Sequence, residues 1–204
     1  MDYKGIIQEE LTTIASYYNS NEVAYLALTA KVEATLRNKL AYRLQQRMMD
    51  EQTTLQVARD WQDTDIAIIT SAGQPEALIY LKSGYIPDET EANSSMIGFY
   101  PKKALDAAQK SHQIGLDHTQ TFAILFYTHQ DRPVEEVYRK SVKHDNAFLR
   151  AFKQHSAEEM LESAKTNITN FFSAKKLPMT HVVIEAGKCW NVKVDIHTWL
   201  VQLS

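Results

Sequence analysis

The sequence has little of the chemistry that marks secreted, disordered or membrane-spanning proteins. A single cysteine among 204 residues excludes an internal disulfide framework and favours a reducing compartment. Five prolines and six glycines leave little room for a long linker. No apolar run approaches the ~20 residues that span a bilayer, and the N-terminus lacks the pattern of a secretory signal. We therefore expect a cytoplasmic protein that does not enter a membrane.

A large excess of positive charge is also absent, since the formal net charge is −3. This value argues against a generally basic nucleic-acid binder, although one face could still be basic. Positive side chains gather within residues 102–153, where solvated helix faces are the ordinary explanation. Within this cluster Lys102 and Lys103 are our candidates for contacts with a nucleic-acid substrate. The cluster comprises Lys102, Lys103, Lys110, Arg139, Lys140, Lys143, Arg150 and Lys153.

The length and the apolar content of 44% are sufficient for one compact domain over residues 1–204. A short helix is expected over residues 3–17. A longer one is expected over residues 22–50, with Asn21 as its cap. Its apolar residues recur at four-residue steps and form one stripe that faces a core. They are Leu28, Val32, Leu36, Leu40 and Leu44.

A β-hairpin is expected after this helix. Residues 65–70 and 77–82 are short apolar strands, and turn residues around Gly73 separate them. A helix should start at Pro101, where the missing N–H does no harm, and end near Gly115. Residues 121–127 form a buried apolar strand.

The last part of the chain is expected to be helical until a closing hairpin. Ser156 and Glu159 form a capping box for a helix that extends through Phe172. Residues 182–184 and 192–196 should pair around Gly187. This order of elements predicts an α/β fold, with a central mixed β-sheet flanked by helices.

The first hairpin brings candidate functional residues together. If its turn centres near Gly73, Asp65 lies opposite about residue 81, close to Tyr80 and Lys82. Residues 80 and 82 share one face because side chains alternate along a strand. Glu33, on the preceding helix, could lean over the same point.

These residues resemble the PD-(D/E)xK nuclease superfamily, which has the restriction-endonuclease-like fold. In that family a helix supplies Glu, one strand begins with Asp, and the next ends in acid-x-Lys. The matching stretches here are residues 32–40, 61–65 and 78–82. The segment from Lys31 to Tyr85 also looks like a group of bacterial proteins of uncertain role that carry this core.

The resemblance implies a Mg²⁺-dependent phosphodiesterase acting on DNA or RNA. Mg²⁺ prefers hard oxygen ligands, polarises the phosphoryl group and activates a water. The resemblance makes Asp65 and Glu33 metal ligands. It also makes Lys82 a catalytic residue together with these two acids.

The sequence departs from the family pattern at Tyr80, where an acid is expected. A neutral phenol with an ordinary pKa near ~10 is a poor Mg²⁺ ligand. Glu76 points to the same face, but four strand residues place it roughly 13 Å away. Asp63 is an alternative to Asp65. The departure favours loss of cleavage over its retention.

Three functions stay open at this point. The chain is a nuclease with an altered metal site, a nucleic-acid-binding protein on the same fold, or a protein-interaction or immunity-type module. Structural explanations also exist for the site residues. Glu33 stands four residues before Arg37, a spacing that stabilises a helix by ion pairing.

Overall fold

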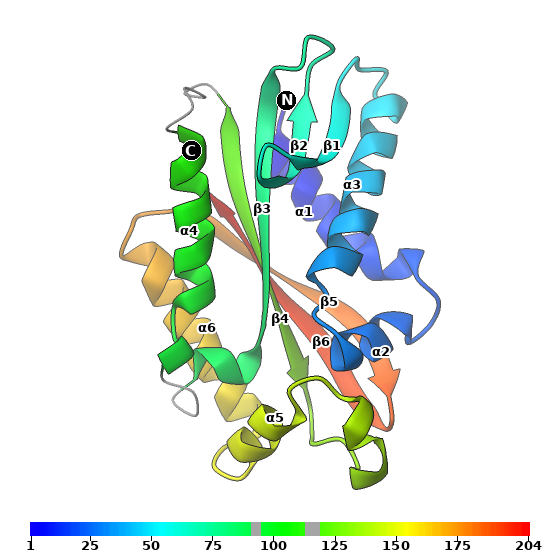
Figure 1. Ribbon diagram of the computed structural model, residues 1–204, viewed down its shortest axis with the longest axis vertical. Helices are drawn as coiled ribbons and strands as arrows, with labels where there is room; N and C mark the ends of the chain where they lie inside the picture. The colour runs from blue at the N-terminus through cyan, green and yellow to red at the C-terminus, as the bar shows by residue number, and fades with distance from the viewer. Residues whose placement is uncertain (91–94, 113–118) are drawn as a thin grey trace.

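The computed structural model describes residues 1–90, 95–112 and 119–204. A mixed sheet of six strands runs through this part of the chain, in the spatial order β1-β2-β3-β4-β6-β5 (Figure 1). Neighbouring strands are antiparallel except β3 and β4, which are parallel. The strands are β1 (Gln56–Trp61), β2 (Thr64–Ile69), β3 (Pro75–Tyr85), β4 (Gln120–Gln130), β5 (Met179–Cys189) and β6 (Val192–Gln202).

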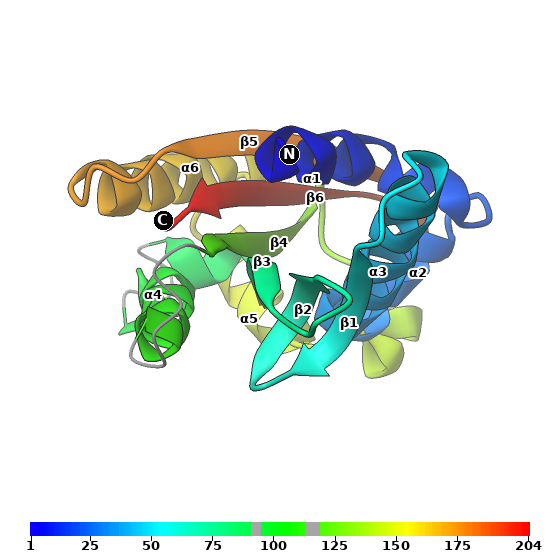
Figure 2. The same cartoon turned by 90° about the horizontal axis from the view of Figure 1, so that it is seen from above.

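Helices cover both faces of the sheet, as the sequence predicts for an α/β fold. One apolar core joins the sheet to α1 (Tyr3–Thr13), α2 (Glu22–Thr29) and α3 (Glu33–Asp50). The other joins it to α4 (Phe99–His112), α5 (Asp145–Phe152) and α6 (Ala157–Ser173). Seen from above, α3 lies beside β1 and β2, whereas α4 lies beyond β3 (Figure 2). Short 3₁₀ helices are η1 (Ile14–Tyr17), η2 (Ile86–Glu89) and η4 (Glu136–Ser141).

Strands β3 and β4 occupy the middle of the sheet and are buried along most of their length. Their near-continuous apolar sequences suit this place, because parallel strands between two helical layers have no solvent face. Helix α4 supplies the crossover that two parallel strands need. By contrast, β5 alternates buried and exposed residues, as expected for a strand at the edge of the sheet.

The single helix expected over residues 22–50 is wrong, since the chain breaks between α2 and α3. Ala30 has an extended backbone, with φ −150° and ψ 169°. The carbonyl of Leu28, which a continuous helix would give to Val32, accepts from the Lys143 N–H at 2.8 Å instead. This tertiary bond lets the helical stripe continue into the same core while α3 begins anew at Glu33.

The expected cap at Asn21 is confirmed only in position. Asn21 precedes α2 in a left-handed conformation, with φ 65°, and its side chain does not cap the helix. Its side-chain oxygen accepts from the Lys188 N–H at 2.8 Å. Asn21 therefore ties α2 to strand β5.

The first hairpin is confirmed and is part of a larger meander. Gly73 lies in the turn between β2 and β3, with φ 76°. Strand β1, which the sequence did not indicate, precedes them and pairs with β2. Asp63, the alternative to Asp65, has φ 66° and lies in the β1–β2 turn rather than on strand β2.

The closing hairpin is confirmed, but its turn is not at Gly187. The chain reverses at Trp190 and Asn191, whose φ values are 48° and 65°. Gly187 marks an irregularity in the β5–β6 register. A Cβ on Gly187 would lie 2.5 Å from the side-chain oxygen of Asn21, and its φ of 100° is unfavourable for other residues. Glycine is thus needed for close packing rather than for the turn.

The remaining helices follow the expected order. The Ser156–Glu159 capping box is present, and α6 extends through Phe172 to Ser173. Helix α4 begins at Phe99, two residues before Pro101. The helix end that the sequence predicted near Gly115 and the side chain of Lys110 lie outside the described residues. None of the described helices is long and apolar enough to cross a membrane.

Candidate functional site

The candidate site lies where strand β3 extends beyond its neighbour β2. The β2–β3 ladder ends with the pair Ile66–Ile79, but β3 continues to Tyr85. On its other edge β3 pairs with β4 as far as Tyr85. Among the described strands none covers the remaining edge of β3 beyond this ladder. Backbone N–H groups on that edge need other acceptors, because unpaired buried polar groups are costly.

Two of the predicted site residues supply these acceptors. Asp65 Oδ2 accepts from the Leu81 N–H at 2.8 Å, and Glu33 Oε2 accepts from the Ser83 N–H at 2.8 Å. The split between α2 and α3 places Glu33 in the first turn of α3. A hydrogen bond to a charged group contributes about 1.5–3 kcal/mol to stability. Both carboxylates therefore hold the end of β3.

Cationic side chains surround the carboxylate of Asp65. Lys82 Nζ lies 3.9 Å from Asp65 Oδ2 and donates to the Leu81 carbonyl at 2.6 Å. Arg37 Nη1 lies 3.7 Å from Asp65 Oδ1 and 2.6 Å from Asp60 Oδ1. The predicted pairing of Glu33 with Arg37 is thus replaced by pairs between Arg37 and two aspartates. Arg37 and Lys82 thus offset the charges of Asp60 and Asp65.

Tyr80 is buried beside this group, with 4% of its surface exposed. Its ring packs with Ala67 and Leu78, and Ala107 of α4 lies against the same cluster. The Thr64 hydroxyl donates to the Tyr80 oxygen at 3.2 Å. Burial raises the pKa of Tyr80, and the charges of Asp65 and Asp63 add to the rise. The phenol therefore stays neutral and forms part of the packing under α4.

This donor set does not suit Mg²⁺. Both oxygens of Asp65 face positive or N–H groups, and one oxygen of Glu33 already accepts a backbone bond. A neutral, buried phenol stands at the position of the third ligand. Throughout the described residues, no three His, Cys, Asp or Glu side chains are grouped to hold a metal. A cation would have to displace Arg37 and Lys82 from Asp65.

The remaining candidates lie elsewhere. Lys102 and Lys103 are exposed on α4, where Lys103 Nζ lies 4.5 Å from the centre of the Phe99 ring. In the described part of the chain no ion pair joins either lysine to Asp65. Glu76 lies beside Tyr3 of α1, whose pKa is raised by burial first and then by Glu76. Glu76 does not replace the missing acid at Tyr80.

A buried acid that the sequence did not single out lies at the end of β3. Glu89 is fully buried, and its carboxylate accepts from the Tyr127 hydroxyl at 2.7 Å and from the Gly98 N–H at 2.8 Å. Burial raises the pKa of Glu89 to about 7. Its sequence context, Pro-Asp-Glu, looks like an ordinary exposed turn, so no local signal reveals it. Full burial makes this a structural group.

Three histidines lie on the neighbouring strands β4, β6 and β5, beside the level at which β3 ends. His181 Nε2 and His197 Nδ1 are 3.1 Å apart, and the rings of His129 and His197 are 5.5 Å apart. Burial is the main cause that lowers the pKa of His197, to about 3. Scattered along the chain, these histidines showed no spacing that would indicate their meeting. They remain neutral packing groups at pH 7.

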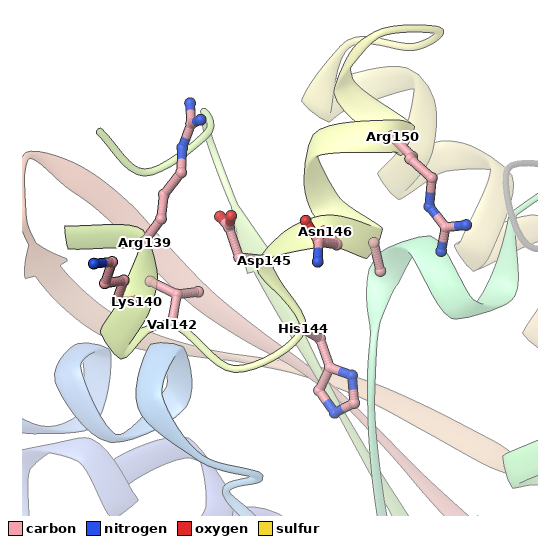
Figure 3. A pocket seen from close by; sticks show the side chains of 8 residues that line it. Arg139, Lys140, Val142, His144, Asp145, Asn146 and Arg150 are labelled. Atoms are coloured by element: carbon pink, nitrogen blue, oxygen red, sulfur yellow. The ribbon is translucent and has the colours of Figure 1, made fainter. Parts of the chain in front are cut away.

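An open groove of about 510 Å³ lies between η4 and α5. Its lining includes Arg139, Lys140 and Arg150, with Asp145 as the acid among the lining residues (Figure 3). These cations belong to the basic cluster of residues 102–153. All the lining residues come from η4, α5 and the link between them, and Asp65 and Lys82 are not among them.

No family model, curated protein or solved structure matches this chain.

Proposed function

We propose that this chain is a restriction-endonuclease-like domain that binds nucleic acid without cutting it. The described fold contains the order α3-β1-β2-β3-α4-β4, with β4 parallel to β3. Lys82 Nζ, near the end of β3, lies 3.9 Å from Asp65 Oδ2, near the start of β2. Glu33 accepts a hydrogen bond from the N–H of the next residue, Ser83. These contacts support the proposal, because the resemblance to the PD-(D/E)xK superfamily places Glu33, Asp65 and Lys82 close together.

The engagement of Asp65 is the observation that carries the proposal. Its carboxylate is bonded to a backbone N–H and faces both Arg37 and Lys82. Metal-assisted hydrolysis needs free acidic oxygens to hold the ion. Tyr80 stands where the resemblance expects an acid. The fold is retained, but Asp65 and Glu33 accept hydrogen bonds from the backbone of β3 and are not free to bind a metal ion.

Exposed cations support binding to the phosphate backbone. Lys102 and Lys103 are exposed on α4, and Lys140 and Arg150 are exposed at the η4–α5 groove. Lysine and arginine contacts to phosphate supply sequence-independent affinity that weakens as salt rises. With a net charge of −3, such binding must be local to these surfaces.

The first experiment measures cleavage and binding on the same preparation. Labelled single-stranded and duplex DNA and RNA are incubated with the protein and Mg²⁺ or Mn²⁺. We expect intact substrates on gels, and salt-dependent binding by fluorescence anisotropy. Metal-dependent cleavage that Asp65→Ala abolishes would show that the domain is an active nuclease. Absence of binding to every substrate at low salt would refute the proposal.

The second experiment restores the missing ligand. Tyr80→Glu combined with Arg37→Gln should create Mg²⁺ binding, measured by calorimetry, because it adds an acid and removes the competing cation. Tyr42→Glu, at an exposed tyrosine of α3, is the matched control and should not change metal affinity. Circular dichroism checks that the buried substitution still folds. The single variant Arg37→Gln tests the competition without altering Tyr80.

A protein-interaction module is the second candidate, favoured by exposed apolar side chains near the groove. Val137 is 75% exposed and Tyr25 49% exposed. Exposed apolar groups of this kind occur at protein interfaces. Val137→Ser, which removes the apolar side chain without adding charge, should then abolish capture of a protein partner while leaving oligonucleotide affinity unchanged.

A further inference from the structure

Three aromatic side chains from distant parts of the chain meet beside the η4–α5 groove. Tyr138 of η4 stacks on Trp190 of the β5–β6 turn, with ring centres 5.4 Å apart and planes 9° apart. Tyr25 of α2 meets the edge of Trp190 at 5.8 Å. Tyr25 and Tyr138 are 49% and 39% exposed. A stacked pair with an open side offers a ready platform for another flat ring.

Backbone bonds hold this platform in place. The Lys143 N–H donates to the Leu28 carbonyl, and the Lys188 N–H donates to Asn21 Oδ1, both at 2.8 Å. These bonds fasten the segment after η4 and the β5–β6 hairpin to the two ends of α2. The rings therefore need little ordering when a ligand binds, which favours affinity.

Positively charged side chains follow the platform residue Tyr138 in the sequence. Arg139 and Lys140 follow Tyr138 in η4, and Arg150 faces the same groove from α5 (Figure 3). Arg139 Nε donates to the Val134 carbonyl at 3.1 Å, which fixes its stem. Over the described residues none of these three cations forms an ion pair. Asp145 is the one acid among the lining residues, so it offsets only part of the charge of these three cations.

Flat rings next to unpaired cations match the chemistry of a single-stranded nucleic acid. Its bases are free to stack on aromatic side chains, and its phosphates bind lysine and arginine. A duplex keeps its base faces stacked inside and would use the cations alone. A peptide would gain less from a stacked ring pair flanked by cations.

We propose that the platform of Tyr25, Tyr138 and Trp190 and the groove of Arg139, Lys140 and Arg150 bind single-stranded DNA or RNA. The inference rests on the proposed nucleic-acid binding and assigns it to residues other than Asp65 and Lys82. A base extends the stack on the exposed side of Tyr138, while the adjoining phosphates enter the groove.

The test compares a fluorescein-labelled oligothymidine of twelve nucleotides with a duplex of equal length, by anisotropy over a series of salt concentrations. Tyr138→Ala should weaken single-strand binding at least about fivefold, the lower bound for one lost base stack, and leave duplex binding unchanged. Lys140→Gln should weaken both. It should also reduce the salt slope for the single strand by about 0.7.

The matched controls are Tyr42→Ala, an exposed tyrosine of α3, and Lys176→Gln, an exposed lysine after α6. Neither should change affinity. Trp190→Phe retains a ring and should retain binding, but it should remove the quenching of tryptophan fluorescence by oligothymidine. The quenching measurement keeps an aromatic ring at position 190.

The possible failures are distinguishable. If the protein binds neither single strands nor duplexes, the proposed function itself is wrong. If it binds single strands but Tyr138→Ala and Lys140→Gln bind like the controls and Trp190→Phe keeps the fluorescence quenching, nucleic acid binds elsewhere and the inference about this surface is overturned.

Discussion

Acid should destabilise this protein through His197, which is 4% exposed and hydrogen-bonded to His181. An unfolded histidine has a pKa near ~6.5, and burial lowers the pKa of His197 to about 3. Between these two pH values, His197 binds a proton in the unfolded chain but not in the folded protein. Stability is therefore complete above pH 6.5 and falls as the pH drops toward 3.

The magnitude follows from the same two values. Each pH unit in this window costs about 1.4 kcal/mol, so the full loss approaches about 5 kcal/mol. The positive groups near His197 oppose its protonation further, and Asp195 pairs with one of them. The groups that lower its pKa after burial are His129, His181, Lys165 and Lys193.

Urea unfolding at a series of pH values from 7 to 4 measures this effect. His197→Gln should remove most of the slope of unfolding free energy against pH, because glutamine carries no proton to exchange. His181→Gln is the matched change on the neighbouring strand and should keep most of the slope, since burial of His197 remains. An unchanged slope in His197→Gln would refute the reasoning.

Two further predictions concern the end of β3. Glu89→Gln should stabilise the protein at pH 8 by about 1–3 kcal/mol in urea unfolding. The pKa of Glu89 is about 7 in the folded protein, whereas that of an unfolded glutamate is near ~4.3. Ionisation of Glu89 therefore lowers the stability of the parent protein as the pH rises through this range. Equal stability of variant and parent at pH 8 would contradict this. Gly84→Ala should lower the melting temperature strongly, since its Cβ would lie 2.7 Å from the Tyr100 ring. The control Gly73→Ala meets no atom within 4 Å and should cost only about 1 kcal/mol for its positive φ.

Local patterns predicted the elements whose own residues determine them. The β2–β3 hairpin follows from two apolar runs around Gly73, and the start of α6 follows from Ser156 and Glu159. Strand β1 was missed because Gln56–Trp61 mixes charged and apolar residues. Such a composition is typical of an edge strand and carries little periodic signal.

Long-range bonds determined what the sequence could not show. At the break between α2 and α3, the Leu28 carbonyl accepts from the N–H of Lys143, which follows β4 in the sequence and is more than a hundred residues away. By contrast, the expected pairing of the two strands correctly predicted that Asp65 and Lys82 would be neighbours. That Asp65 and Glu33 would bond Leu81 and Ser83 depends on where β2 ends relative to β3, which no local pattern specifies.

The overhang of β3 has a consequence for behaviour in a crowded cell. A strand edge with spare N–H groups invites β-strand addition by another polypeptide and can seed aggregation. Asp65 and Glu33 occupy two of these donors and place negative charge along the edge. An intruding strand would have to displace both carboxylates. Asp65 and Glu33 thus protect this edge of β3 against strand addition, in addition to holding its end in place.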